Sequence, residues 1–235
     1  LTPRAEKMNY KRNGIAKELL KTEENYVRRL TVLEDVFQRP LSEQCNSATP
    51  FVTRQDVRTL FGDVEVILGL NRVVLQEITA KLQSWTSAAM LGDVFVKLGK
   101  VGAFRWYHSY VSNYDKAHAL LNQLKSSSKQ FKESIDQAEC RPELNFSDLE
   151  SLLILPIQRI PQYNMLLSDL LKNTWPEHSD YKNIKQAVKT MREIASLVNE
   201  KKRESENIER VLELEAKIDG FPVRTCLLWQ SSIYS

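Results

Sequence analysis

Two prolines interrupt a regular helical pattern between residues 149 and 171, and this combination limits what the chain can fold into. Apolar side chains recur there every three or four residues, the spacing that places them on one face of an α-helix: Leu149, Leu152, Leu153, Pro156, Ile160, Tyr163, Leu167 and Leu170. A proline inside a helix removes a backbone hydrogen bond and costs about 3 kcal/mol or more. We therefore predict a buried, kinked helix that displays a second, mixed polar and apolar stripe, made of Ile154, Gln158, Gln162 and Met165.

The rest of the chain has the same helical character. Only 7 glycines and 8 prolines occur in 235 residues, mostly between long periodic stretches, and this favours an all-α fold. We predict an elongated multi-helix bundle with a long C-terminal helix. Helices are expected from about Ala5 to Phe37 with a stop at Pro40, from a Thr53/Asp56 cap to Ile78, from Gly92 toward Leu124, from about Ser127, from a Ser147/Glu150 cap to near Thr174, and from about Asp180.

The C-terminal end of the chain indicates a change of structure. The last helix should run to about residue 218, where Gly220-Phe221-Pro222 forms a stop signal. Residues 223–229 then have the pattern of a β-strand, which needs a partner strand to satisfy its backbone hydrogen bonds. We therefore predict a helical domain over residues 1–218, followed at 219–235 by a linker and the first strand of a truncated second domain.

Composition and charge exclude several classes of function. The net charge of +3 is nearly balanced, with acidic residues interspersed among the basic ones, so nucleic-acid binding is not expected. The 3 cysteines and 3 histidines lack metal-ligand spacing, and no nucleophile or phosphate-binding motif is present. We expect no cofactor, no bound metal and no covalent catalysis. No run of about 18 apolar residues occurs, so a cytoplasmic protein is expected.

Glu23 is an anomaly in the first predicted helix. It lies four residues after Leu19 and four before Val27, a position where the apolar stripe calls for a leucine. A carboxylate there is costly unless it is paired or the groove stays open to a partner. The residue pattern leaves both interpretations open: an internal salt bridge or a partner contact.

Three blocks of sequence resemble one family. Residues 152–171, with Pro156-Ile157-Gln158-Arg159 and then Tyr163 followed by leucines, look like the signature helix of Dbl-homology domains, the Rho-family guanine nucleotide exchange factors. Residues 18–30 are similar to the family's first conserved region, and residues 107–117 to its second. The blocks stand in the family's order, and a pleckstrin-homology domain usually follows at the place where the predicted strand begins.

The resemblance implies a function and a set of contact residues. An exchange factor of this family stabilises the nucleotide-free GTPase, so it catalyses nucleotide release without covalent chemistry, and the magnesium ion belongs to the GTPase. Glu23 would contact switch I, while Ile154, Gln158, Gln162 and Asn199 would act on switch II or select the partner. Pro156, Arg159 and Tyr163 would form the structural signature, with Arg159 bonding neighbouring helices.

The implied partner is a Rho-family small GTPase, and Ile154 leans toward Rac-like members. Gln162 departs from the family, which most often carries a basic residue before the signature tyrosine. A monomer is expected, and recruitment to the plasma membrane only through the missing adjacent domain.

Two other classes of function remain open from the residues. Gln162 motivates a helical scaffold that binds a GTPase without promoting exchange. The long first and last helices are also compatible with a membrane-shaping or coiled-coil structural module.

Overall fold

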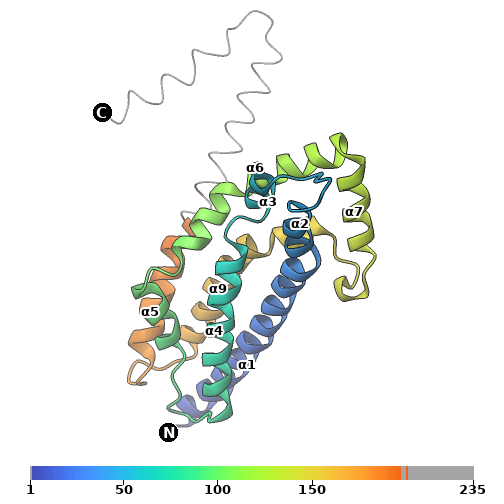
Figure 1. The fold of residues 1–235 in the computed structure, drawn as a ribbon. Helices are drawn as coiled ribbons and strands as arrows, with labels where there is room; N and C mark the ends of the chain where they lie inside the picture. Colours follow the sequence, from blue (N-terminus) through green and yellow to red (C-terminus); the bar gives the residue numbers. More distant parts are fainter. Residues whose placement is uncertain (1, 197–199, 201–235) are drawn as a thin grey trace, which may run out of the picture. The chain divides into compact units, whose positions relative to one another are not determined.

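The computed structural model describes residues 2–196 and residue 200, and within them every regular element is helical (Figure 1). The predicted all-α bundle is therefore confirmed. Contacts divide the chain into residues Leu1–Val198 and Asn199–Ser235. Four predictions lie outside the described residues: those for Asn199, the end of the last helix, the boundary at residue 218 and the strand at 223–229.

The first helix continues past the proline that was expected to end it. Helix α1 (Pro3–Val32) runs into a π-helical segment (Leu33–Gln38) and then into α2 (Arg39–Gln44), so the prediction of a stop at Pro40 is wrong. In the π-helical segment the backbone N–H of Arg39 donates to the carbonyl of Glu34, one residue further back than in an α-helix. Pro40 lies in the first turn of α2, directly after the π-helical segment.

Glycine turns divide two stretches that were predicted as single helices. Gly62 has a φ of 50° and separates α3 (Arg54–Phe61) from α4 (Val64–Gln83), while Gly102, with a φ of 65°, lies between α5 (Gly92–Lys100) and α6 (Arg105–Ser127). Such φ values favour glycine because it lacks a Cβ atom. The Thr53/Asp56 capping box is confirmed, since the Asp56 backbone N–H donates to Thr53 Oγ1 over 3.1 Å.

Ser128 caps α7 (Lys129–Glu139), and a single 3₁₀ turn (Pro142–Leu144) leads toward the proline-containing helix. This helix is in two pieces, α8 (Leu149–Leu153) and α9 (Leu155–Lys172), with the break at Ile154. The kink thus precedes Pro156, which begins α9, while Pro161 lies inside it. The expected Ser147/Glu150 cap is wrong, because Asp148 is the capping residue and accepts from the Ser151 backbone N–H over 2.8 Å.

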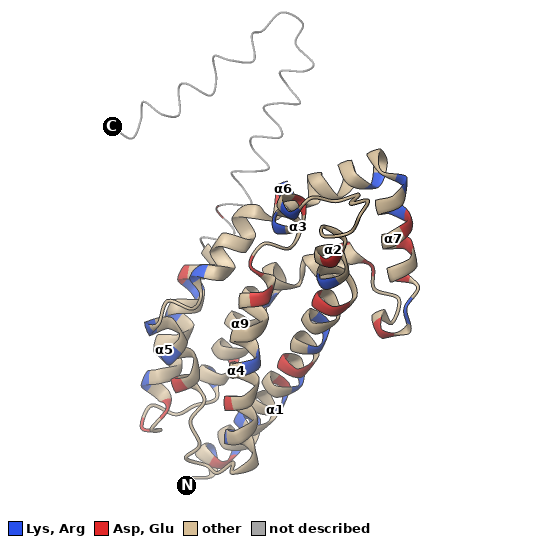
Figure 2. Cartoon of the chain, in the orientation of Figure 1, with Lys and Arg blue, Asp and Glu red and all other residues tan. Residues whose placement is uncertain are grey.

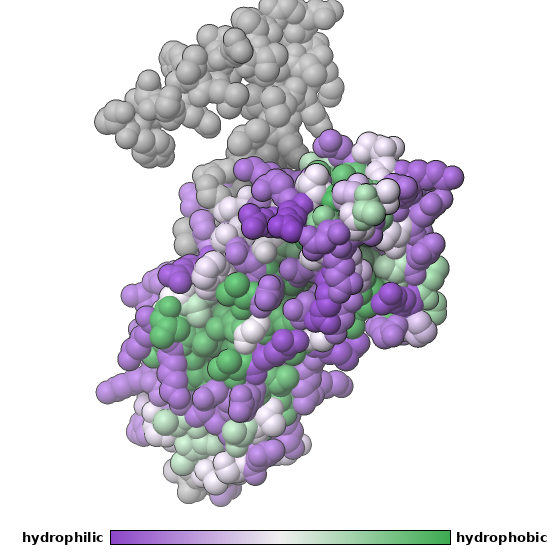
Figure 3. Space-filling view, in the orientation of Figure 1, coloured by the Kyte–Doolittle hydropathy of each residue, from purple (hydrophilic) through white to green (hydrophobic). Residues whose placement is uncertain are grey.

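The core lies where α1 packs along α4 and α9, and where α6 packs on α3, α7 and α9. Basic and acidic residues are interspersed along most helices (Figure 2). The space-filling view shows an apolar area over α4 and α5, and two of the exposed large apolar residues, Val66 and Val73, lie on α4 (Figure 3). No helix among the described residues is both long and apolar enough to cross a membrane.

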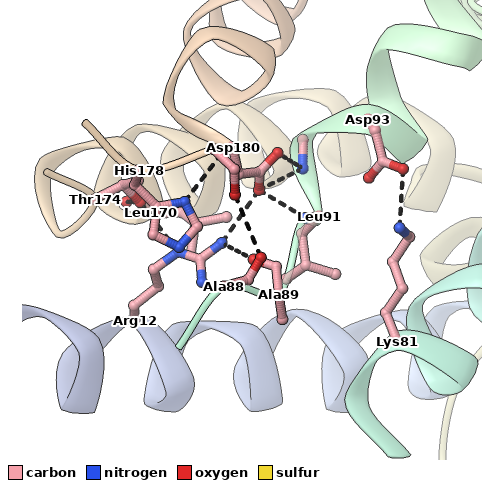
Figure 4. Close-up of polar contacts among 12 residues, drawn as sticks. Arg12, Lys81, Ala88, Ala89, Leu91, Asp93, Leu170, Thr174, His178 and Asp180 are labelled. Carbon is pink, nitrogen blue, oxygen red and sulfur yellow. Dashed lines mark hydrogen bonds and ion pairs between the residues drawn. The ribbon is translucent and has the colours of Figure 1, made fainter. Parts of the chain in front are cut away.

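A buried ion pair fixes the start of the last described helix, residues 181–196, against α1 (Figure 4). Arg12 Nη2 lies 3.2 Å from Asp180 Oδ2, and both side chains are fully buried. Asp180 Oδ2 also accepts from the backbone N–H groups of Leu91 over 2.7 Å and Gly92 over 3.0 Å. Arg12 Nε donates to Thr174 Oγ1 over 3.2 Å. The cluster ties α1 to the start of α5 and to the turn that follows α9.

His178 completes this cluster as a neutral imidazole. Its Nδ1 accepts from the Asp180 backbone N–H over 2.9 Å, so Nε2 carries the proton and donates to the Ser87 carbonyl over 2.8 Å. Burial, and secondarily the positive charge of Arg12, lower the pKa of His178. The charged form is therefore disfavoured in the folded protein.

Candidate functional site

A second buried cluster joins α1 to α9 and is built around Glu23. Both Arg159 Nη2 and the Tyr163 hydroxyl donate to Glu23 Oε2, the latter over 2.6 Å. Glu23 is 0% exposed and Arg159 is 1% exposed, although they are 136 positions apart in sequence. The Arg159 guanidinium also lies over the Tyr163 ring, 4.2 Å from its centroid. The internal salt bridge, one of the two interpretations left open for Glu23, is thus present.

The cluster extends into α4 and α6 through neutral polar groups. The Tyr163 hydroxyl lies 2.8 Å from Asn71 Oδ1, and Asn71 Nδ2 donates to the Tyr107 hydroxyl over 2.6 Å. The Tyr107 and Tyr26 hydroxyls are 3.3 Å apart. Four helices therefore share one continuous hydrogen-bonded network that is shielded from water.

Burial governs the protonation of this network. Burial raises the pKa of Glu23, while the positive charge of Arg159 and the Tyr163 hydrogen bond act in the opposite direction. Burial also raises the pKa of Tyr163 well above its ordinary value, and the negative charge of Glu23 adds to this. The tyrosine consequently remains a hydrogen-bond donor across the physiological pH range.

The mixed stripe of α9 faces solvent directly above this network, as the residue spacing predicted. Gln158 and Met165 are exposed, with Met165 at 53%, whereas Ile154 and Gln162 are half-buried. Pro156, Arg159 and Tyr163 lie on the buried side of the same helix. We call Ile154, Gln158, Gln162 and Met165 the α9 strip.

Gln162 connects the α9 strip to the buried cluster. Its Oε1 accepts a hydrogen bond from Arg159 Nη1, while Nη2 of the same guanidinium binds Glu23. A lysine or arginine at position 162 could not accept a hydrogen bond from Arg159, so this contact gives a physical reason for the glutamine found there. One residue of the strip, Gln162, is therefore held by the buried charged pair.

The structure brings together some of the predicted site residues and not others. Glu23 is buried in the ion pair with Arg159 rather than exposed on the surface beside the α9 strip, and its contact with a partner stays a prediction. Asn199 lies outside the described residues, and its role stays a prediction. Ile154, which is half-buried, forms the break between α8 and α9.

Sequence reasoning missed Arg12, Asn71 and Asp180. Arg12 lies four residues before Ala16 and seven before Leu19, both buried, so it breaks the apolar stripe of α1 as Glu23 does. Asn71 interrupts α4 in the same manner, four residues after Ile67. A polar residue at a core position was thus the available signal, but the sequence does not show which partner neutralises it.

The bundle and its α9 strip have the properties of a helical protein-binding domain: a fixed, solvent-facing helix surface supported by a buried polar network. Residues 15–199 match the family described as the RhoGEF domain. The chain therefore belongs to the RhoGEF domain family.

Named relatives agree with this assignment, and a solved structure shares the fold. The chain is 34% identical over 90% of its length to Guanine exchange factor for Rac 30 of Dictyostelium discoideum, and 35% identical over 89% to Kinase and exchange factor for Rac B of the same organism. It spans only 12% and 19% of these relatives' own lengths. A crystal structure of the N-terminally truncated linker and DH/PH domains of p115-RhoGEF shares the fold, with a TM-score of 0.77 at 24% identity, over 87% of this chain and 60% of that one.

Proposed function

We propose that this chain is the catalytic bundle of a guanine nucleotide exchange factor for Rho-family GTPases, with the α9 strip as part of its GTPase-binding surface. The observation that carries the proposal is the coupling of the exposed strip to the buried Glu23–Arg159 pair through Gln162. A surface that is ordered before its partner arrives loses less conformational entropy on binding. The family assignment over residues 15–199 supports the same function.

Such a function needs no reacting side chain. A protein that binds the nucleotide-free GTPase more tightly than the nucleotide-bound form shifts that equilibrium, and each tenfold acceleration of release requires about 1.4 kcal/mol of differential stabilisation. The side chains of the α9 strip offer an amide that both donates and accepts, and apolar groups that can be buried against a partner. This mixture suits binding to a GTPase whose surface is remodelled on binding, without cleavage or covalent modification of that partner.

Glu23 has an indirect role in this proposal. Because its carboxylate is fully buried and bound by Arg159 and Tyr163, it positions α9 instead of touching the GTPase. Asn199 and Ile154 keep their proposed roles, contact with switch II and partner selection. The names of the two Dictyostelium relatives refer to Rac, which supports a Rac-like partner for this chain.

Release of a fluorescent GDP analogue tests the proposal directly. Rac-, Rho- and Ras-type GTPases are each incubated with and without this protein, and we expect acceleration only for Rho-family members. A paired variant, Gln158→Ala with Met165→Ala, should slow release without changing the unfolding transition, because both side chains are exposed. The matched control is Lys116→Ala with Lys132→Ala, two exposed residues on α6 and α7.

The scaffold without exchange activity makes a different prediction. It would give a measurable complex with a Rho-family GTPase and no change in nucleotide release at any protein concentration. That result would replace the exchange proposal with the scaffold.

A further inference from the structure

The helix at residues 181–196 carries a basic face that the proposed exchange function does not use. Its inner side is buried in the core through Ile184, Ala187, Val188 and Met191. Its outer side presents exposed cations at intervals of three and four residues, so they lie along one face of the helix: Lys182, Lys185, Lys189 and Arg192. We call these residues the basic stripe.

The basic stripe borders a hollow rather than a convex ridge. A depression of about 660 Å³ lies between this helix and the end of α9, and every member of the stripe lines it. Leu171 of α9 and Val188 contribute an apolar floor. Glu193 also lines it, so the hollow combines the four cations of the stripe with one carboxylate and a small apolar surface.

Acidic side chains neutralise little of this charge. Within residues 2–196 the structure pairs one member of the stripe with a carboxylate, Lys189 with Glu193, at 3.9 Å between two largely exposed side chains. Elsewhere basic residues have closer partners, such as Lys172 with Asp169 at 2.9 Å and Lys81 with Asp93 at 2.9 Å. Like charges at this helical spacing repel one another, and an anionic partner would remove that cost.

We propose that the basic stripe binds the surface of a membrane that contains anionic phospholipids, with lipid phosphates as the recognised groups. The stripe extends over about 15 Å of helix, at roughly 1.5 Å per residue, so several headgroups can be contacted at once. Lysine and arginine stems can rest on the apolar floor while their charged ends reach the phosphates. None of the described residues that line the hollow is aromatic, so it lacks the stacking platform that single-stranded nucleic acid requires.

This inference is independent of nucleotide exchange and departs from the expectation that only a missing domain would contact the membrane. It gives the bundle its own, weak affinity for an anionic leaflet. Each cation should contribute about fivefold to partitioning, the equivalent of about 1 kcal/mol near an anionic surface. Because the attraction is screened within about 8 Å at physiological salt, binding must weaken as salt is added.

Cosedimentation of the full chain with vesicles tests the proposal. Phosphatidylcholine vesicles are compared with vesicles that mix phosphatidylcholine and phosphatidylserine, at low and physiological salt. We expect salt-sensitive binding to the mixed vesicles only. The stripe variant carries Lys182→Gln, Lys185→Gln, Lys189→Gln and Arg192→Gln, and its binding should fall by about several hundredfold, since four contributions of about fivefold multiply.

A control variant with the same change of net charge keeps the test specific. It replaces exposed cations on and around α6 and α7: Lys116→Gln, Lys129→Gln, Lys132→Gln and Arg141→Gln. Full binding by this control together with loss in the stripe variant supports the proposal. Equal loss of vesicle binding in both variants would overturn it. Binding of the chain to a DNA duplex as tight as its binding to the mixed vesicles would also overturn it.

Exchange measured in solution, without vesicles, separates this inference from the proposed function. The stripe variant should release GDP from the GTPase at the parental rate. If it loses exchange in solution and keeps vesicle binding, the stripe is a GTPase contact and the membrane assignment is wrong.

Discussion

Arg12 and Asp180 form an ion pair across 168 residues of sequence, with no exposed surface on either side chain. The pair closes the bundle at one end, while Glu23 and Arg159 form an equivalent pair further along α1. Both pairs place a charge of α1 where the helical pattern requires an apolar group. A buried pair need not stabilise a protein relative to an apolar one, but loss of one partner leaves a buried charge without compensation.

Asp180→Asn should destabilise the bundle strongly. The substitution keeps the shape of the side chain but leaves Arg12 charged and buried, and we expect a loss of about 3 kcal/mol in the free energy of unfolding. Urea denaturation measures this difference. Asp169→Asn is the matched control, since its pair with Lys172 is largely exposed and should change stability by less than about 1 kcal/mol. Equal effects of the two substitutions would contradict the assigned role of Asp180.

Glu23→Ala should affect both stability and exchange. A direct contact with switch I, as the resemblance implies, would give slower exchange with the bundle intact, but a fully buried carboxylate that binds Arg159 and Tyr163 leads us to expect about 3–5 kcal/mol of destabilisation. Tyr163→Phe removes only a hydroxyl and should cost about 1–2 kcal/mol. Thermal unfolding and GDP release measured on the same samples test the coupling. Slower exchange with unchanged stability in Glu23→Ala would show a direct contact with the GTPase instead.

The stability of the bundle should depend on His178 below neutral pH. Because the pKa of this imidazole is lowered on folding, the unfolded chain takes up a proton more readily, and folding stability rises with pH through this window. The stabilisation is complete above the ordinary pKa of 6.5 and is lost as the pH falls from there toward the lowered value. His178→Asn should flatten this dependence because an amide does not titrate. Its oxygen can still accept a hydrogen bond from the Asp180 backbone N–H, so the fold should be kept. Urea midpoints compared at a series of pH values provide the test, and an unchanged slope would rule out His178 as the source.

Gly92→Ala should disrupt the junction between α5 and the last described helix. A Cβ atom at this position would lie 2.4 Å from the Ile184 backbone nitrogen, far inside van der Waals contact. The backbone must therefore shift, which also weakens the hydrogen bonds from Leu91 and Gly92 to Asp180. We expect a loss of about 2–3 kcal/mol in unfolding free energy, the range of overpacked core positions. Gly69→Ala on α4, where no heavy atom lies within 4 Å, is the control and should leave stability unchanged or raise it slightly.

The sequence by itself determined the helical class, the proline-containing helix and its buried and exposed faces. These follow from local periodicity, because Leu149, Ile160 and Tyr163 can share a buried face only if the segment is helical. The sequence also indicated that Glu23 was out of place on an apolar stripe. It could not determine that Arg159 is its partner, because the two residues meet only when α1 packs on α9.

Tertiary structure decided the remaining features. Pro40 did not end the first helix, because the chain passes from α1 through the π-helical segment directly into α2, whose first turn holds Pro40; Leu33, Val36 and Phe37 of the π-helical segment are buried in the core. The Arg12–Asp180 pair and the hollow beside the basic stripe likewise exist only once the ends of α1 and α9 and the last described helix are brought together. Local propensity sets where helices form, whereas the neutralisation of a buried charge depends on contacts between distant segments, and those contacts are fixed only when the core is packed.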